Sequence, residues 1–208
     1  MIDIKSMTLE EITNLLKEWG EPAFRGKQVF TWLHKGITAF DDMSNLSKSL
    51  RTKLAEQCYI TVPAVARKQV SQLDGTIKYL WELYDGNAVE TVVMRYHHGN
   101  TVCISSEVGC PMGCAFCASG LLRRDRNLTS AEMVGQVIVM NQILAEEADN
   151  VSHVVVMGTG EPFDNYDNVS SFIHIMNEAK GLAIGARHIT VSTCGLVPGI
   201  KRYAEEGI

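Results

Sequence analysis

The second half of the chain alternates between strand-like and helix-like segments. Three apolar runs with strand character lie at residues 101–108, 152–157 and 187–193. Each run is followed by a helix-like segment, at about residues 129–144, 168–180 and 198–206, and a capping box of Thr129 and Glu132 begins the first of these segments. Because a strand, a helix and a parallel strand connect by right-handed crossovers, this order predicts an α/β fold with a parallel sheet. In such sheets, ligands bind where the strands end at their carboxyl edge.

A helical unit and a β-meander precede these segments. The helices are predicted at about residues 8–19, 25–35 and 47–57, the first beginning at a capping box of Thr8 and Glu11. Strand-like runs then meet at the turn dipeptides Asp74-Gly75, Asp85-Gly86 and Gly99-Asn100. We therefore divide the chain into a small helical accessory domain (1–60), a β-meander linker (61–96) and a core (97–208).

Basic residues cluster near the ends of the predicted N-terminal helices: Arg25, Lys27, Lys35, Lys48, Arg51 and Lys53. They are candidates for contacts with RNA phosphates, although a solvated surface is the simpler explanation. The net charge of −5 argues against a surface coated with nucleic acid but leaves room for a local basic path. The sequence has no apolar run near the ~20 residues that a membrane span needs, and it has no secretory signal. We expect a cytoplasmic protein whose thiols stay reduced.

Three cysteines lie close together after the first of the apolar runs. Cys110, Cys114 and Cys117 form a C-x3-C-x2-C pattern. Structural zinc takes four ligands, usually as two separated pairs, and iron–sulfur cubanes normally take four cysteines. His97 and His98 are possible fourth ligands, although their spacing is unlike that of a zinc finger. Three thiolates alone indicate a cluster with one open iron, free to bind a substrate.

This spacing, placed after the first strand of a βα series, resembles the radical S-adenosylmethionine (SAM) superfamily. The resemblance implies that the three cysteines hold one [4Fe-4S] cluster, and that the open iron binds SAM and reduces it to a 5′-deoxyadenosyl radical. The segment Gly158 to Pro162, GTGEP, resembles the family's GGEP motif. It implies that Gly160 and Glu161 contact the amino group of SAM. Ser192 resembles the position that contacts the SAM ribose or carboxylate.

Longer stretches narrow the resemblance. EPAFRGKQVFTWLHKG, AVETVVMRY, TVCISSEVGCPMGCAFCASG, VVVMGTGEPFDNYDNV and HITVSTCGLVPGI resemble the dual-specificity 23S rRNA and tRNA adenine-C2 methyltransferases. In that family one SAM methylates an enzyme cysteine, and a radical from a second SAM activates the methyl group for addition to adenine. By position, Cys103 matches the cysteine that resolves the protein–RNA adduct, and Glu90 matches the proton acceptor near the base. Without the resemblance, each would be an ordinary strand residue.

The resemblance carries further implications. The substrates are 23S rRNA and tRNA, the electron donor is a flavodoxin or another low-potential protein, the enzyme is a monomer, and a disulfide bond forms. Arg123, Arg124 and Arg126 are candidates to grip phosphates near the site.

The chain also departs from the family pattern. About three of six βα units of the barrel are present, and the methyl-carrying cysteine is expected beyond Ile208. We therefore expect an N-terminal fragment that cannot complete methyl transfer alone. Two alternatives stay open at this point: a relative that methylates adenine C8, and a zinc-bound RNA-binding module without catalysis.

Overall fold

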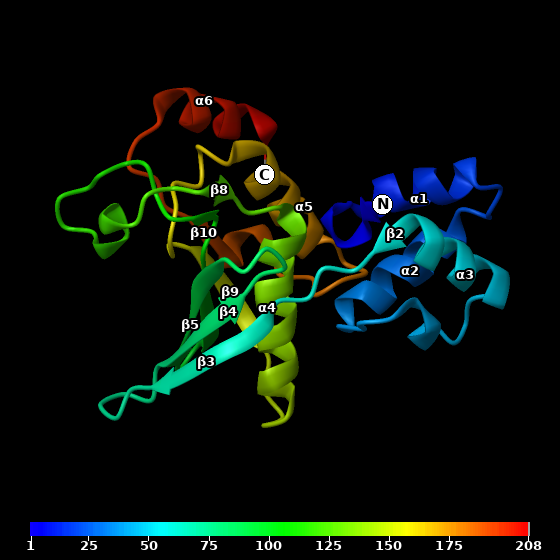
Figure 1. Ribbon diagram of the computed structural model, residues 1–208, viewed down its shortest axis with the longest axis horizontal. Helices are drawn as coiled ribbons and strands as arrows, with labels where there is room; N and C mark the ends of the chain where they lie inside the picture. Colours follow the sequence, from blue (N-terminus) through cyan, green and yellow to red (C-terminus); the bar gives the residue numbers. More distant parts are fainter. Residues whose placement is uncertain (208) are drawn as a thin grey trace.

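A six-stranded mixed sheet is the centre of the structure, a computed structural model that describes residues 1–207 (Figure 1). The strands stand in the order β10-β9-β6-β5-β4-β3. Their bounds are β3 Ala64–Val70, β4 Ile77–Glu82, β5 Ala88–Tyr96, β6 Gly99–Ile104, β9 Val151–Val156 and β10 Ile189–Val191. The pairs from β3 to β6 are antiparallel, whereas β6, β9 and β10 are parallel.

Each parallel strand leads into a helix. The three helices are α4 Ser130–Ala145, α5 Tyr166–Asn177 and α6 Val197–Glu206. The structure therefore contains three βα units after a meander, and the predicted α/β class with a partial (βα) barrel is confirmed. The second predicted capping box is also present, since Thr129 accepts from the Glu132 amide and the Glu132 side chain accepts from the Thr129 amide.

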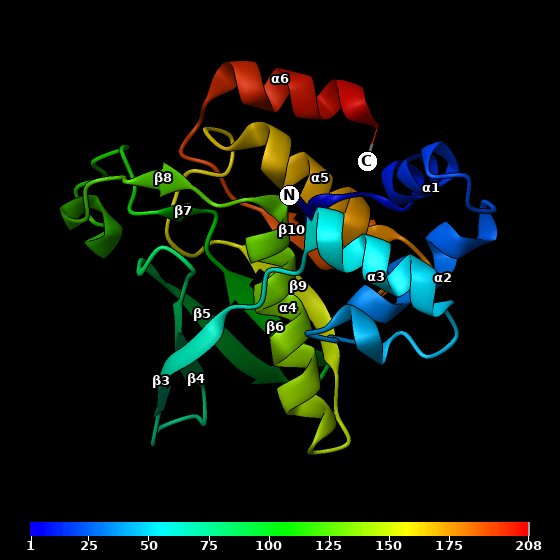
Figure 2. The ribbon, with the colours of Figure 1, turned by 45° about the vertical axis from the view of Figure 1, so that its right-hand side comes forward.

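One face of the sheet is covered by helices. Helix α4 lies across β6 and β9, and α5 packs beside it (Figure 2). Because side chains alternate along a strand, Val102 and Ile104 of β6 point to the same face as Val154 and Val156 of β9. All four are buried, as is Phe172 of α5. We call this the covered face.

The alternate residues of the same strands form the opposite face, which we call the open face. The strand registers place the following side chains on it: Lys78, Leu80, Glu90, Val92, Met94, Cys103, His153 and Val155. Each of them is half-buried or exposed. The open face therefore keeps polar and reactive side chains within reach of other molecules.

Segment 61–96 was predicted as a meander linker and forms three strands of the same sheet as the core. The turn predicted at Gly99-Asn100 is wrong by two residues. His97 and His98 form the turn, and Gly99 and Asn100 begin β6 opposite Tyr96 and Arg95. The φ of +121° at Gly99 allows this early return into the strand.

The N-terminal unit consists of α1 Leu9–Glu18, α2 Phe24–His34 and α3 Lys48–Gln57. The capping box of Thr8 and Glu11 is present at α1. Strand β1 (Ile2–Asp3) pairs with β2 (Cys58–Tyr59), so the two ends of the unit are joined. Its core is continuous with that of the sheet.

Short elements complete the chain. The 3-10 turns are η1 Ile4–Ser6, η2 Phe40–Asp42, η3 Ala118–Leu121 and η4 Ala186–His188. Strand β7 (Glu107–Val108) pairs with β8 (Arg126–Asn127). Among the helices described for residues 1–207, none has both the length and the apolar character needed to cross a bilayer.

Candidate functional site

Three segments meet at the carboxyl edge of the parallel strands. The cysteine loop follows β6, GTGEP follows β9, and the segment 192–195 follows β10. They enclose a cavity of about 270 Å³. All six residues predicted for cluster and SAM contacts line it: Cys110, Cys114, Cys117, Gly160, Glu161 and Ser192. The structure therefore brings together motifs as far apart in the sequence as Cys110 and Ser192, as expected for the ends of parallel strands.

The cysteine loop is exposed. Phe116, between two of the cysteines, is 94% exposed. Burial raises the pKa of Cys110, whereas hydrogen bonds from the backbone and side chain of Ser119 lower the pKa of Cys117. The loop begins at Gly109, whose φ is +75° and where an added Cβ would lie 2.3 Å from the Arg123 carbonyl oxygen. Only glycine allows the two ends of the loop to approach so closely.

The donor set fits an iron–sulfur cluster better than a single metal ion. Across residues 1–207, no three His, Cys, Asp or Glu side chains gather closely enough to hold one ion. A cubane offers a separate iron to each thiolate, so its ligands need only line one cavity. His97 and His98 lie before β6 and the cysteines after it, a separation of roughly 20 Å at ~3.3 Å per residue. The histidines therefore cannot complete a zinc site with the three cysteines.

Glu161 is held by three donors from its own chain. Its carboxylate accepts from the Thr193 hydroxyl at 2.7 Å, the Cys194 amide at 2.7 Å and the Phe163 amide at 3.0 Å. Burial by itself would raise the pKa of Glu161, but these hydrogen bonds outweigh it and lower the pKa below the ordinary value. The ionised carboxylate thereby ties the GTGEP turn to the segment after β10.

Glu107 is a buried carboxylate that the sequence analysis missed. It accepts from the Glu161 amide at 2.8 Å and from the Arg124 guanidinium at 3.3 Å. Burial raises the pKa of Glu107, against both hydrogen bonds. A Cβ on Gly160, whose φ is +116°, would lie 2.8 Å from the Glu107 side chain. A charged residue inside the apolar run just before the cysteines was the signal that could have revealed it.

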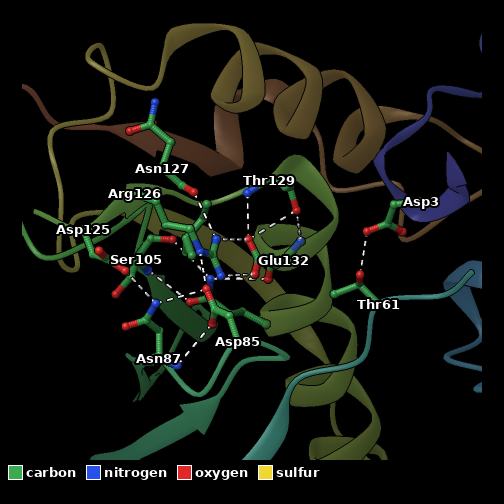
Figure 3. Close-up of polar contacts among 12 residues, drawn as sticks. Asp3, Thr61, Asp85, Asn87, Ser105, Asp125, Arg126, Asn127, Thr129 and Glu132 are labelled. Carbon is green, nitrogen blue, oxygen red and sulfur yellow. Dashed lines mark hydrogen bonds and ion pairs between the residues drawn. The ribbon is translucent and has the colours of Figure 1, made fainter. Parts of the chain in front are cut away.

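Arg124 and Arg126 were candidates for phosphate contacts, and the structure uses both internally. Arg124 pairs with Glu107 and Asp164. Arg126 makes two 2.8 Å hydrogen bonds to Glu132 and one of 2.6 Å to Asp85. Figure 3 shows Arg126 between the start of α4 and the β4–β5 turn. These two sets of ion pairs, each including one buried carboxylate, count against phosphate contacts for both residues. For Arg123, no ion pair is found in the part of the chain described, and the phosphate contact stays a prediction.

Glu90 and Cys103 both lie on the open face. Cys103 stands opposite Val92, two residues along β5 from Glu90. The Glu90 carboxylate forms a 2.9 Å ion pair with Lys78 and is about half exposed. Glu90 also borders a second hollow, of about 320 Å³, with Gly109 and Ser119 of the cysteine loop. Burial raises the pKa of Cys103, which keeps its sulfur as a thiol.

All six cysteines in the described residues are free, so the expected disulfide bond is not found. Cys194 lines the same cavity as the three clustered cysteines. A hydrogen bond to Glu161, together with burial, raises the pKa of Cys194 to about 11.

Comparison with known families agrees with the site. Residues 2–60 match the ribosomal RNA large subunit methyltransferase N-terminal domain, and residues 104–208 match the radical SAM superfamily. The crystal structure of a radical SAM methyltransferase from Sphaerobacter thermophilus superposes with a TM-score of 0.89 at 41% identity. That match covers 98% of this chain and 60% of the other.

Two curated relatives carry the name "Probable dual-specificity RNA methyltransferase RlmN". The protein from Alkaliphilus oremlandii is 52% identical over 204 residues, which are 98% of this chain and 59% of the relative. The protein from Bacillus thuringiensis is 52% identical over 206 residues, 99% of this chain and 57% of the relative. The chain thus spans less than two thirds of the length of the relatives it matches.

A three-thiol loop and a GTGEP turn at the carboxyl edge of parallel strands, together with the superfamily match over residues 104–208, define a radical SAM protein. Within this superfamily the chain is homologous to the RlmN methyltransferases, because its N-terminal unit matches their N-terminal domain and nearly its whole length matches two curated relatives of that name.

Proposed function

We propose that this chain supplies the cluster- and SAM-binding part of an RNA methyltransferase that methylates adenine C2 in 23S rRNA and in tRNA. The observation that carries the proposal is the cavity in which Cys110, Cys114 and Cys117 face Gly160 and Glu161. With a [4Fe-4S] cluster and SAM bound there, one-electron reduction of the sulfonium supplies the radical that an unreactive aromatic carbon requires.

The chain's own residues have distinct roles in this proposal. The three cysteines hold the cluster. Gly160 lets the backbone approach the SAM amino group, because it has no side chain. Glu161 contributes a negative charge to that amine and, through Thr193 and Cys194, orders the segment that carries Ser192. Ser192 then contacts the SAM ribose or carboxylate.

The open face provides the groups that act on RNA. Glu90, which forms a 2.9 Å ion pair with Lys78, accepts a proton from the base. Cys103, on the neighbouring strand, resolves the protein–RNA adduct. We assign the methyl-carrying role to neither Cys58, which is buried, nor Cys194, whose thiol pKa is raised to about 11 by a hydrogen bond to Glu161 and by burial.

The proposal extends to partners and location. The donor of the electron is a flavodoxin or another low-potential protein, and the enzyme acts as a monomer. Since its rRNA and tRNA substrates are cytoplasmic in bacteria, we place the enzyme in the cytoplasm.

Anaerobic reconstitution with iron and sulfide tests the proposal. We expect about four irons per chain and a change in the electron paramagnetic resonance spectrum of the reduced cluster when SAM is added. Cys114→Ala should lose the cluster, whereas the matched control Cys58→Ala should keep it. Zinc as the native metal, or a spectrum that SAM leaves unchanged, would contradict the assignment. Mass mapping of the methylated base in the complete enzyme distinguishes C2 from C8.

A further inference from the structure

A basic hollow lies away from the cysteine loop, between α2 and the segment that follows α5. Its volume is about 310 Å³. Three lysines line it, Lys27 and Lys35 from α2 and its C-terminal end and Lys180 from the core, and its lining contains no carboxylate. We call it the lysine hollow.

No carboxylate of the described residues neutralises the charges of the lysine hollow, although the Lys35 ammonium lies over the Trp32 ring, 4.6 Å from its centre. Among the ion pairs of residues 1–207, none includes Lys27, Lys35 or Lys180. Other basic residues of the N-terminal unit differ, since Arg25 pairs with Glu21 and Arg51 with Asp41. The chain as a whole has a net charge of −5. Three cations without a carboxylate partner therefore make the surface at this hollow locally positive on an otherwise acidic chain, and this favours the binding of an anion.

The neutral groups of the hollow also favour an anion. The Trp32 indole donates to the Asn45 side-chain oxygen at 2.6 Å. The Gln28 side-chain oxygen accepts from Arg25 at 2.8 Å. Because both amide oxygens are used, the amide NH₂ groups remain as donors. Ammonium and amide donors together match the oxygens of a phosphate.

The two sides of the hollow are fixed to each other. The Thr31 hydroxyl of α2 donates to the Lys180 carbonyl oxygen at 3.0 Å. The Gln142 side chain of α4 donates to the Gly36 carbonyl oxygen at 3.1 Å and to that of Lys35 at 3.3 Å. The backbones that carry the lysines of the two units are thus held together before any ligand arrives, which lowers the entropy cost of binding.

We propose that the lysine hollow binds a backbone phosphate of the substrate RNA and so fixes the RNA across the N-terminal unit and the core. This inference rests on the proposed function, which makes RNA the substrate. A compact group of cations in a hollow suits one phosphate, whereas an acidic protein would meet a wider surface with its carboxylates.

A salt titration tests the lysine hollow. The binding of a fluorescent 23S rRNA hairpin is measured by anisotropy over a range of potassium chloride concentrations. The variant is K27Q/K35Q/K180Q. The matched control is K17Q/K68Q/K201Q, which removes the same charge from exposed lysines that lie outside the hollow and are not among the candidate phosphate contacts. Thermal melting confirms that both variants are folded.

The hollow variant should bind the hairpin about tenfold more weakly at 0.1 M salt, and its slope of log K against log salt should fall by about 0.7–0.9, the value for one phosphate. The control should keep the slope of the original chain. Equal effects in both variants, or none in either, would overturn the proposal.

Two further outcomes separate this inference from the proposed function. If the original chain binds iron and SAM but no RNA, both the RNA substrate and the lysine hollow fail. If the hollow variant binds RNA normally but is reduced more slowly by flavodoxin, the hollow is a donor-docking surface and the phosphate proposal alone fails.

Discussion

The two faces of the central sheet come from the same strands and differ in how deeply most of their side chains are buried. On the covered face, Val102 and Val154 are fully buried beneath helices. On the open face, the neighbouring Cys103 and His153 are only half-buried. Alternate residues of one strand therefore separate stability from chemistry. The comparison teaches that a reactive residue can lie next to a core residue in sequence and still contribute little to folding.

The largest expected effect is on the covered face. Phe172→Ala removes a fully buried ring from α5 and should lower the free energy of unfolding by about 3–5 kcal/mol. Leu73→Ala, at the exposed tip of the β3–β4 hairpin, is the control and should change it by less than about 0.5 kcal/mol. Urea denaturation measures both. Equal midpoints for the two variants would mean that the covered face does not dominate stability.

An intermediate effect, on SAM affinity, is expected at Glu107, which lies at the carboxyl edge of the sheet beside the cysteine cavity. Glu107→Gln replaces one carboxylate oxygen by a donor, so either the Glu161 amide or Arg124 loses its acceptor. The dissociation constant for SAM of the reconstituted protein should rise about tenfold, or about 1.4 kcal/mol. Anaerobic calorimetry measures it.

The matched control for Glu107→Gln is Glu132→Gln, because Glu132 is also buried and paired with an arginine but lies at the start of α4. It should lower the melting temperature and leave SAM affinity unchanged. Loss of affinity in both variants would show that Glu107 acts through general stability and not by positioning the GTGEP turn.

The smallest effect on stability is expected on the open face. Cys103→Ala removes a half-buried thiol and should change the free energy of unfolding by less than about 1 kcal/mol. The iron content after reconstitution should also stay the same, since Cys103 does not line the cysteine cavity. Denaturation and iron analysis check both. If the variant is unfolded or poor in iron, Cys103 contributes to the structure, and the conclusion that open-face residues contribute little to folding is wrong.

Local rules were sufficient to predict much of this structure from the sequence. The capping boxes at Thr8 and Thr129 involve residues three positions apart, and both form. The meeting of the cysteine loop, GTGEP and Ser192 follows from a general property of parallel strands.

Long-range pairs escaped prediction, because a sequence does not show which charged groups become neighbours. Arg126 meets Asp85 from a turn on another hairpin, and Arg124 meets the buried Glu107. Tertiary contacts of this kind give both candidate phosphate ligands internal partners. The position of the β5–β6 turn was missed for a different reason. Gly99 has the positive φ that is typical of a turn residue, but it is the first residue of β6 and follows the His97–His98 turn.

Strand β6 pairs with β5 in antiparallel and with β9 in parallel orientation, and this has a consequence for the order in which the strands pair during folding. Val102 pairs with Val93 through a tight hairpin, but it reaches Val154 only after the cysteine loop and all of α4. Closing a short loop costs less entropy than closing a long one, so β5 and β6 should pair first and then serve as a template for β9. Pulse-labelled hydrogen exchange should show amides of β5 protected before those of β9. Strands β9 and β10, which together with β6 carry the segments around the cysteine cavity, are therefore the last strands to join the sheet during folding.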